Sequence, residues 1–377
     1  MDKSKIEWQP PKILNPHSFR DEYPEFRDIE VNEDVDVLAK DIAELLHPDK
    51  TSSKPFMSLA RMSIAMSIDN LTNIVVFEHD NTAVRYPKEE LHHELRTDRR
   101  RNLDTTEELK VLGEATIASI GLSVGSNIAE AVVQDGIGKE IIIADYDTIS
   151  ATNLNRINAT MADVGLRKTV WFGRRISAIN PYMKQTHLSE GYSPSCDNEL
   201  SSKGIDVIIE EVDNMQAKAQ TRELAKNLKV PLVMVGDLGD TVLLDVERHD
   251  LENVKPFNGK VSLSLYEKAL AGELSKKETE TFLLKINQGL KNVSPRMIQS
   301  AMLRGVELNG FPQKGGTVKA GASLASLAIG EILLGRKVSS GSYRLPLRKV
   351  LKLSPATTFR ESLAIFGEFI KYRKNDS

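Results

Sequence analysis

The stretch ATIASIGLSVGS at residues 115–126 decides the fold of this chain. Its first half is a short apolar run, which predicts a buried strand over residues 115–120. Its second half, GLSVGS at residues 121–126, is a turn of small residues, and residues 127–134 then predict a helix. A strand, a tight turn and a helix in this order place free backbone N–H groups at the turn, where the positive end of the helix dipole also lies. We therefore expect a phosphate-binding turn.

Apolar strands alternate with helices on the carboxyl side of this turn. Strands are predicted at residues 141–144, 205–209 and 231–235, with a helix at residues 215–228 between the last two. Fully apolar strands that alternate with helices favour a parallel sheet covered on both faces. The predicted fold class is α/β, with a Rossmann-like, mostly parallel sheet. The segment after Asp250 is predicted to be mostly helical.

The amino-terminal part has a different pattern. The residues up to about Glu33 show no clear period and are predicted to form an arm or loop. Helices are then expected from Asp34 or Asp36 onward and over residues 57–66, followed by a β-hairpin over residues 73–86. We expect a small α+β, winged-helix-like module at residues 1–90, and the Rossmann-like domain, with a helical carboxyl-terminal part, at residues 91–377.

Composition limits the classes of protein that this chain can belong to. The formal net charge of -3 gives no basic field for a nucleic acid, and no apolar stretch approaches the length of about 20 residues that spans a bilayer. No secretory signal is visible, so we expect a cytoplasmic protein without nucleic-acid or membrane partners. The single cysteine, Cys196, excludes an intrachain disulfide and a zinc site of paired cysteines, so no zinc is expected.

The turn alone leaves several functions open. Gly121-x-Ser123-x-Gly125 fits a hydrolase nucleophile elbow, which would need Asp213 or Asp237 and then His249. The segment around His249, at residues 247–250, is highly charged and is predicted to be solvated surface, which disfavours that interpretation. A nicotinamide-dependent oxidoreductase would also place a glycine-containing turn here, although the full G-x-G-x-x-G pattern is missing, and a turn of purely structural role would need small residues as well.

The second strand supplies the deciding residues. Asp145 ends it, where a carboxylate can accept hydrogen bonds from both hydroxyls of a ribose. Asp147, Asn153 and Arg156 follow in a polar loop, and Lys168 comes a dozen residues later. This run resembles the superfamily of ThiF, MoeB and the ubiquitin-activating enzymes, which share an acid-x-Asp pair, an Asn-Leu-x-Arg run and a later lysine. The resemblance covers residues from about 96 to 250.

The end of the third strand completes the resemblance. Asp213 and Asn214 are similar to the Asp-Asn pair of the family, whose aspartate holds Mg²⁺. The resemblance implies an ATP-dependent, carboxylate-activating adenylyltransferase, with Asp213 as the metal ligand. It implies catalytic roles for Arg156, Lys168 and Asp213, and a homodimer in which Arg99 or Arg101 reaches the partner's ATP site. The nucleotide-binding residues that it implies are Gly121, Ser123, Gly125, Ser126, Asp145, Asp147, Asn153, Arg156, Lys168 and Asn214.

Two departures from the family pattern change the expected substrate. Ser123, Val124 and Ser126 stand where the family has glycines, and the chain lacks the cysteines that sulfur-carrier and ubiquitin-activating members often carry. The chain is therefore more similar to the peptide-tailoring branch that includes MccB and PaaA. That resemblance implies a ribosomally made precursor peptide as substrate, activated on a carboxylate such as a glutamate side chain and then cyclised in antibiotic biosynthesis. Activation of a sulfur carrier or ubiquitin-like protein is a second possible function, and a non-catalytic ATP-site scaffold is a third.

Overall fold

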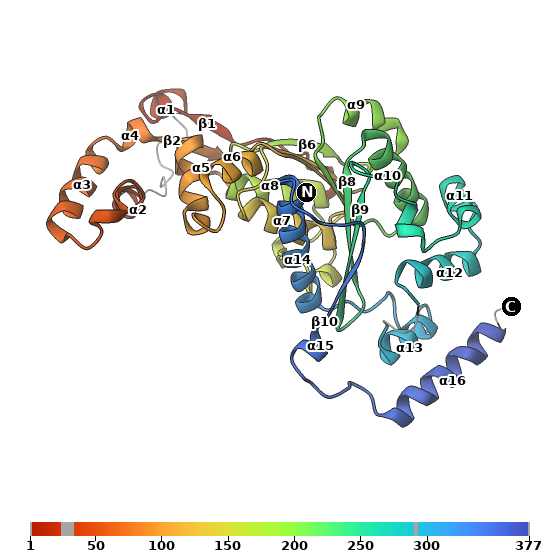
Figure 1. The fold of residues 1–377 in the computed structure, drawn as a ribbon. Helices are drawn as coiled ribbons and strands as arrows, with labels where there is room; N and C mark the ends of the chain where they lie inside the picture. The colour runs from red at the N-terminus through yellow and green to blue at the C-terminus, as the bar shows by residue number, and fades with distance from the viewer. Residues whose placement is uncertain (1, 24–33, 290–292, 376–377) are drawn as a thin grey trace.

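The computed structural model describes residues 2–23, 34–289 and 293–375, which form a small amino-terminal sheet and a large central sheet (Figure 1). The strands are β1 (Lys12–Leu14), β2 (Thr72–Phe77), β3 (Thr82–Pro87), β4 (Thr116–Ile120), β5 (Glu140–Ala144), β6 (Lys184–Leu188), β7 (Val207–Glu210), β8 (Pro231–Asp237), β9 (Thr241–Arg248) and β10 (Gly341–Pro346). The α-helices are α1 (Pro16–Glu22), α2 (Val35–Leu46), α3 (Lys54–Met66), α4 (Ile68–Leu71), α5 (Glu89–Thr97), α6 (Thr106–Gly113), α7 (Val124–Gln134), α8 (Lys168–Ile179), α9 (Asp197–Ser201), α10 (Met215–Leu228), α11 (Leu263–Ala271), α12 (Lys276–Ile286), α13 (Pro295–Leu303), α14 (Gly315–Leu333), α15 (Leu347–Val350) and α16 (Phe359–Asn375).

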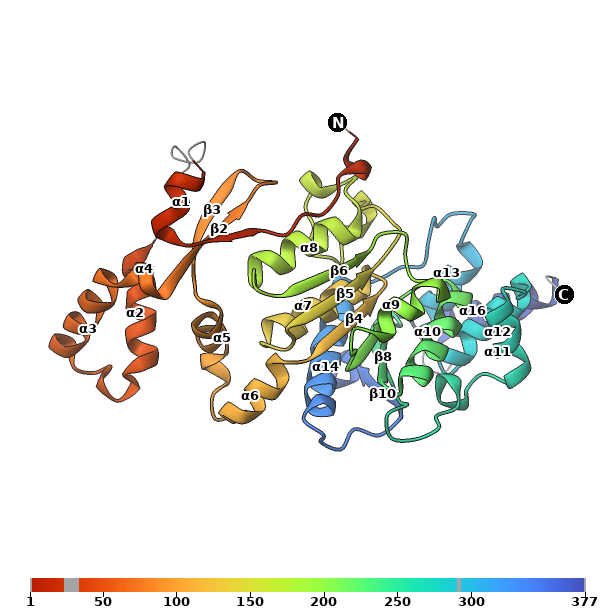
Figure 2. The same cartoon turned by 90° about the horizontal axis from the view of Figure 1, so that it is seen from above.

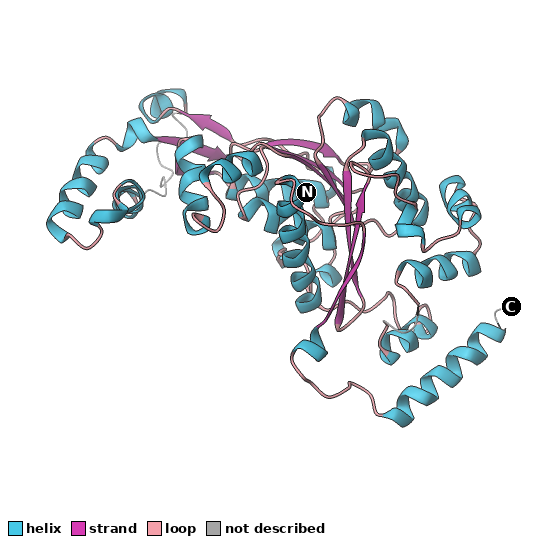
Figure 3. Cartoon of the chain, in the orientation of Figure 1, coloured by secondary structure: helices cyan, strands magenta, loops and turns pink. Residues whose placement is uncertain are grey.

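The central sheet has the order β10-β9-β8-β7-β4-β5-β6. Helices lie on both sides of its strands (Figure 3). Strands β4 to β8 are parallel, whereas β9 and β10 are added as antiparallel strands at one edge. Helices α7, α8 and α14 cover one face, and α9 and α10 cover the other. The side chains of each strand alternate between the two cores: Ile117 packs under α7 and α14, and its neighbour Ala118 faces α10. The predicted fold class, an α/β mostly parallel sheet with helices on both faces, is confirmed.

This topology brings four chain segments to one edge of the sheet. The carboxyl ends of β4, β5, β7 and β8 lie side by side, because all four strands run in the same direction. Parallel sheets bind their ligands at this edge, on both sides of the point where the strand order reverses. Here the chain adds β5 and β6 on one side of β4 and then β7 and β8 on the other side. The order therefore reverses at β4, between β4 and β7. The turn at residues 121–126 follows β4 directly and lies at that point.

The amino-terminal sheet lies apart from the central one and carries α2 and α3 beside it (Figure 2). The predicted helices and hairpin are present, and Asp34 caps α2 through a hydrogen bond from the amide of Val37. The arm predicted up to about Glu33 is wrong for residues 12–22. Residues 12–14 of this arm form strand β1, which pairs with β2. Asn15 then caps helix α1. A three-residue strand has no period of its own, so only its partner reveals it. Residues 24–33 of that prediction lie outside the described residues.

Strands β6, β9 and β10 were not predicted, whereas the described part of the segment after Asp250 is mostly helical, as expected, with β10 as an added strand. One prediction in this part of the chain is wrong. The charged residues 247–250 were predicted to be surface, yet Glu247, Arg248 and His249 are at most 8% exposed. Their charges are paired inside the protein, which is the condition under which charged side chains are buried. No helix within the described residues is long and apolar enough to cross a membrane.

Candidate functional site

Gly121 allows the turn after β4 to pass very close to the neighbouring strand. Its backbone has φ +93°, and a Cβ atom placed there would lie 2.5 Å from the backbone of Glu211, just after β7. Any side chain at this position would therefore clash and would also be strained in the left-handed region. The turn is thus held against the segment that carries Asp213. These are two of the segments that the sequence analysis assigns to one nucleotide site.

The amino terminus of α7 is open toward this turn. The helix begins at Val124, three residues earlier than predicted, and no side chain caps it. Its first amide groups therefore have no partner within the helix and lie at the positive end of its dipole. Gly125 is in this first turn. Ser126 is buried, and its hydroxyl donates to the carbonyl oxygen of Ser123, at 3.0 Å. Of the two serines predicted to bind nucleotide, only Ser123 lines the cavity described below.

The acid pair after β5 fixes the other side of the turn. The Asp145 carboxylate accepts hydrogen bonds from the amides of Leu122 (2.7 Å) and Asp147 (2.8 Å). Burial raises the pKa of Asp145, against the opposing effect of the Lys168 charge. The Lys168 ammonium lies 2.7 Å from Asp147 and 3.4 Å from Asp145, so it contacts these acids directly. Asp147 is half exposed and retains acceptor capacity for a ligand.

Arg156 connects the loop after β5 to the turn. Its Nε donates to the hydroxyl of Ser123 at 3.1 Å, and another guanidinium nitrogen donates to the carbonyl of Thr152 at 2.9 Å. Burial lowers the pKa of Arg156, while the charges of Asp213 and Asp237 oppose that shift. Asn153 is buried and accepts a hydrogen bond from the amide of Ser150, so its side chain holds the loop that presents Arg156.

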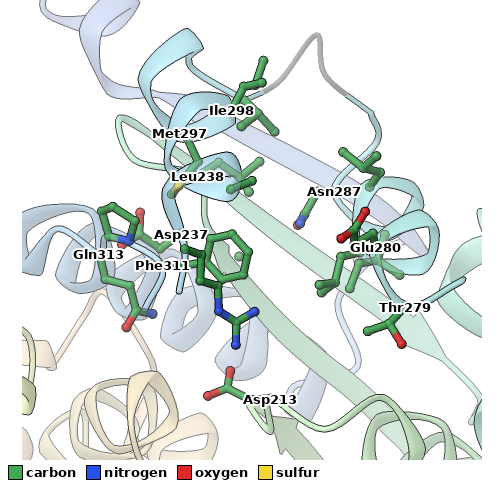
Figure 4. A pocket seen from close by; sticks show the side chains of 18 of the residues that line it. Asp213, Asp237, Leu238, Thr279, Glu280, Asn287, Met297, Ile298, Phe311 and Gln313 are labelled. Carbon is green, nitrogen blue, oxygen red and sulfur yellow. The ribbon is translucent and has the colours of Figure 1, made fainter. Parts of the chain in front are cut away.

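Asp213 faces a cavity of about 640 Å³ that begins at the turn (Figure 4). Ser123, Asp213 and Asp237 all line it, which brings the ends of β4, β7 and β8 to one space. Asp213 is exposed and makes no hydrogen bond or ion pair with any residue that the structure describes. Asn214 was predicted to bind nucleotide, but its side-chain oxygen accepts the amide of Ala217 and caps α10.

The residues present suit a magnesium ion bound together with a nucleotide. Within the described ranges, no group of three or more His, Cys, Asp or Glu side chains is placed to hold a metal ion by itself. Mg²⁺ is commonly held by one or two carboxylates, with phosphate oxygens and water as its other ligands. Asp213 offers such a carboxylate, since it has no other partner in the described ranges, and it lines the same cavity as Val124 at the start of α7. The site therefore fits a Mg²⁺ ion that arrives with a triphosphate.

Arg99 and Arg101 lie away from this site, in the segment between α5 and α6. The Arg99 side chain is 94% exposed, and Arg101 is half exposed beside Asp98. Neither residue lines the cavity. Their predicted role in a partner subunit's site stays a prediction, because it concerns a second copy of the chain.

Two residues at the site were missed by sequence reasoning. Asp237 was considered only for a hydrolase triad, yet its carboxylate accepts the amides of Gly239 and Lys314, and burial raises its pKa. Lys319 of α14 donates to the side chains of Asn127 in α7 (3.1 Å) and Asn158 (2.7 Å). Lys319 directly precedes the run of small residues at 320–328, and a lone charge at the start of such a run was the available signal.

Residues 98–249 match the model of the ThiF family, so the chain carries a ThiF family domain. This range contains the turn, the acid pair, Arg156, Lys168 and Asp213. The match confirms the family expected from the sequence, and its bounds agree with the predicted range of about 96 to 250.

Individual proteins resemble different lengths of the chain. An uncharacterized protein of Mycobacterium tuberculosis is 33% identical over 258 residues, which is 68% of this chain and 35% of that protein. The tRNA threonylcarbamoyladenosine dehydratase of Escherichia coli is 33% identical over 136 residues, 36% of this chain and 50% of the enzyme. The chain thus spans half or less of the length of these relatives. A crystal structure of PaaA matches with a TM-score of 0.46 and 17% identity, covering 68% of each chain.

Proposed function

We propose that this chain is an Mg-ATP-dependent adenylating enzyme that activates a carboxylate on a ribosomally made precursor peptide. One observation carries the proposal: the start of the uncapped helix α7 and the carboxylate of Asp213, which has no hydrogen bond or ion pair among the described residues, line one cavity in a ThiF family domain, and the guanidinium of Arg156 is hydrogen-bonded to Ser123 in the wall of that cavity. Adenylation brings a carboxylate and the α-phosphate of ATP together, so the site has to neutralise two anions and hold them in line. The proposed site supplies the groups for both tasks.

Each residue has a defined task in this proposal. The open amides of α7 and the guanidinium of Arg156 bind phosphate oxygens, and Asp213 binds the Mg²⁺ that accompanies ATP. Asp145 and Asp147 accept the ribose hydroxyls, and Lys168 holds the two acids in place until the nucleotide binds. The carboxylate oxygen of the substrate attacks the α-phosphorus, the bond to the bridging oxygen of the β-phosphate breaks, and pyrophosphate leaves.

The amino-terminal sheet supports a peptide as the substrate. Its strand β3 is an edge strand, since the order is β1-β2-β3, and an extended peptide can add to such an edge through backbone hydrogen bonds. The chain also has no second cysteine with which to relay a thioester or to complete a zinc site. In the proposed reaction the acyl-adenylate forms on a carboxylate of the peptide, such as a glutamate side chain. A neighbouring amine of the same peptide then attacks the acyl carbon and loses a proton, the bond from that carbon to the phosphate oxygen breaks, and a ring closes with release of AMP. The enzyme works as a cytoplasmic homodimer in this proposal.

The relatives named for a tRNA nucleoside make tRNA the second candidate substrate. The net charge of -3 and an apolar cavity wall favour a peptide over a polyanion.

Pyrophosphate release tests both candidates in one assay. The purified chain is incubated with Mg-ATP and, in parallel, with peptides encoded beside its gene and with total tRNA. We expect release with one of the peptides, a product lighter by one water for each ring formed, and release that is about 10²–10³-fold slower in Asp213→Asn. Release with tRNA alone would replace the peptide by tRNA. If ATP does not bind at all, the chain is a scaffold rather than an enzyme.

A further inference from the structure

Two charged side chains that line the cavity have no hydrogen bond or ion pair among the described residues. Seven charged residues line it, and five of them have an interaction elsewhere in the protein: Glu211, Lys218, Asp237, Lys276 and Glu280. Asp213 and Arg304 are different, because neither forms a hydrogen bond or ion pair with any residue in the described part of the chain. Two opposite charges that face one cavity without being satisfied indicate groups that a ligand satisfies.

Arg304 is presented by a loop that is tied to the nucleotide side of the site. The loop joins α13 to α14, and the guanidinium carbon of Arg304 lies 4.8 Å from the ring centre of Phe311 in the same loop. At its far end, the carbonyl of Gln313 accepts from Asn155, and the amide of Lys314 donates to Asp237. A Cβ atom on Gly315 would lie 2.2 Å from the carbonyl oxygen of Asn155, so this junction is closely packed. The loop is therefore fixed beside Arg156.

The wall of the cavity between these charges is largely apolar. Leu238 follows β8, Leu283 comes from α12, Met297 and Ile298 from α13, and Phe369 from α16. Figure 4 shows Met297, Ile298 and Leu238 on the side of the cavity opposite Asp213. A wall of this kind gains free energy from burying apolar groups and penalises charged ones. It suits a substrate whose surface is apolar next to its carboxylate.

We propose that this cavity binds the acceptor as a carboxylate flanked by apolar side chains, and that Arg304 is the specificity-determining residue that pairs with that carboxylate. The proposal rests on the proposed adenylation. Arg304 and Phe311 orient the carboxylate, Leu283 and Met297 hold the neighbouring apolar groups, and Asp213 stays with the metal side. After attack on the α-phosphorus the carboxylate has become a neutral acyl group, so its attraction to Arg304 is lost when the acyl-adenylate forms. No proton has to move in this step.

The charge pattern argues against a polyanionic acceptor. Besides Arg304, the positive side chains of the cavity are Lys218 and Lys276, and both have partners within the protein. Three acids, Glu211, Asp213 and Asp237, lie on the nucleotide side. A single available cation suits one carboxylate, whereas a nucleic acid needs a row of them.

Calorimetric titration of the whole chain, saturated with Mg²⁺ and α,β-methylene-ATP, tests this. The probes are acetyl-Leu-Leu-Phe with a free carboxylate, the same peptide as its amide, and acetyl-Ser-Ser-Ser with a free carboxylate. We expect the first probe to bind about tenfold more tightly than either of the others, a difference typical of one charged pair or of a buried apolar side chain. Arg304→Ala removes the preference over the amide, and Met297→Lys removes the preference over the serine peptide.

Two control variants test whether the lost preferences come from these side chains or from a general loss of folding or binding. Arg296→Ala removes an exposed arginine of the neighbouring helix α13 that does not line the cavity, and Met297→Leu keeps an apolar side chain. Both should retain the wild-type preferences. An unchanged preference in Arg304→Ala, or failure of the wild type to bind the Leu-Leu-Phe acid while α,β-methylene-ATP binds, overturns the inference and leaves the nucleotide site intact. Failure to bind α,β-methylene-ATP overturns the proposed function itself.

Discussion

Glu210 and Glu211 are neighbours at the end of β7, but they belong to two different kinds of charged cluster. Glu210 is fully buried and pairs with Lys218 and Arg222 of α10, at 2.9 and 2.7 Å. Arg222 also pairs with Glu247 at 2.7 Å and stacks on the ring of Phe257. We call Glu210, Lys218, Arg222 and Glu247 the closed network. Each of its charges is satisfied within the protein.

Glu211 lies on the side of the turn and belongs to the open site, which also contains Arg156, Asp213, Asp237 and Arg304. Its carboxyl accepts only the amide of Val235, and two members of this group have no hydrogen-bonding partner in the described residues. The difference shows how one sheet end serves two purposes. Charges that satisfy one another fix α10 to the sheet, whereas charges left without an ion pair are available for a ligand.

Arg222→Met breaks the closed network and has the largest expected effect on stability. It leaves Glu247 without its main partner and weakens the pairing of Glu210, so the free energy of unfolding should fall by about 3–5 kcal/mol. Urea-induced unfolding, followed by circular dichroism, measures the change. The exposed pair of Lys226 and Glu223 on the same helix is the control, and Lys226→Ala should cost less than about 1 kcal/mol. If both variants lower the free energy of unfolding by the same amount, the closed network does not stabilise the fold more than an exposed ion pair does.

Asp213→Asn tests the open site in the opposite way. The side chain has no partner to lose among the described residues, so the thermal midpoint should stay at its wild-type value. Pyrophosphate release should fall by about 10²–10³-fold, as expected when a group that stabilises developing charge is removed. Arg156→Ala should lose activity similarly. Asp49→Asn, an exposed acid far along the chain, serves as control and should change neither quantity. Wild-type release by Asp213→Asn would contradict the assignment of the site.

The sequence predicts well those strands and helices whose pattern of apolar residues matches their burial in the folded protein. Strands β4, β5, β7 and β8 are apolar on both faces, and α10 was predicted with its observed bounds. β9 was missed because Glu247 and Arg248 interrupt its apolar pattern, and only their pairing with Arg222 and Asp250 explains their burial. β6 is an edge strand whose residues are only partly buried, so it lacks the apolar run of the central strands.

For the candidate site, the sequence predicted a set of residues but not their contacts. Gly121, Asp145, Arg156, Lys168 and Asp213 were selected from motif order, and the structure places them at one edge of the sheet. The sequence did not show that Lys168 contacts both acids. Arg304 was not predicted at all, because its position depends on how the loop before α14 returns to Asn155, nearly 150 residues earlier, and no local motif records such a contact.

The pH dependence of stability should report the burial of the Glu211 carboxyl. Burial raises the pKa of Glu211 well above its usual value, opposed by Lys218, so the folded protein holds a proton that the unfolded chain releases. Between the ordinary pKa of a glutamate, about 4.3, and this raised value, the unfolded state binds fewer protons, and stability therefore falls as pH rises. Thermal melts across this range should show the fall. Glu211→Gln should flatten it, and an unchanged slope would contradict the assigned burial.

Ser126→Ala and Ser123→Ala compare two hydroxyls of the same turn and carry the smallest expected effects. The Ser126 hydroxyl is buried against the carbonyl of Ser123, so its removal should cost about 1 kcal/mol of stability and leave pyrophosphate release within about twofold. The Ser123 hydroxyl accepts from Arg156 at the cavity, so Ser123→Ala should reduce release about tenfold with little change in the thermal midpoint. Both variants are measured in the same assay. If Ser126→Ala is the variant that loses activity, the Ser126 hydroxyl contacts the bound nucleotide instead of the carbonyl of Ser123. Ser126, in the first turn of α7, would then belong to the binding site rather than to the structural part of the turn.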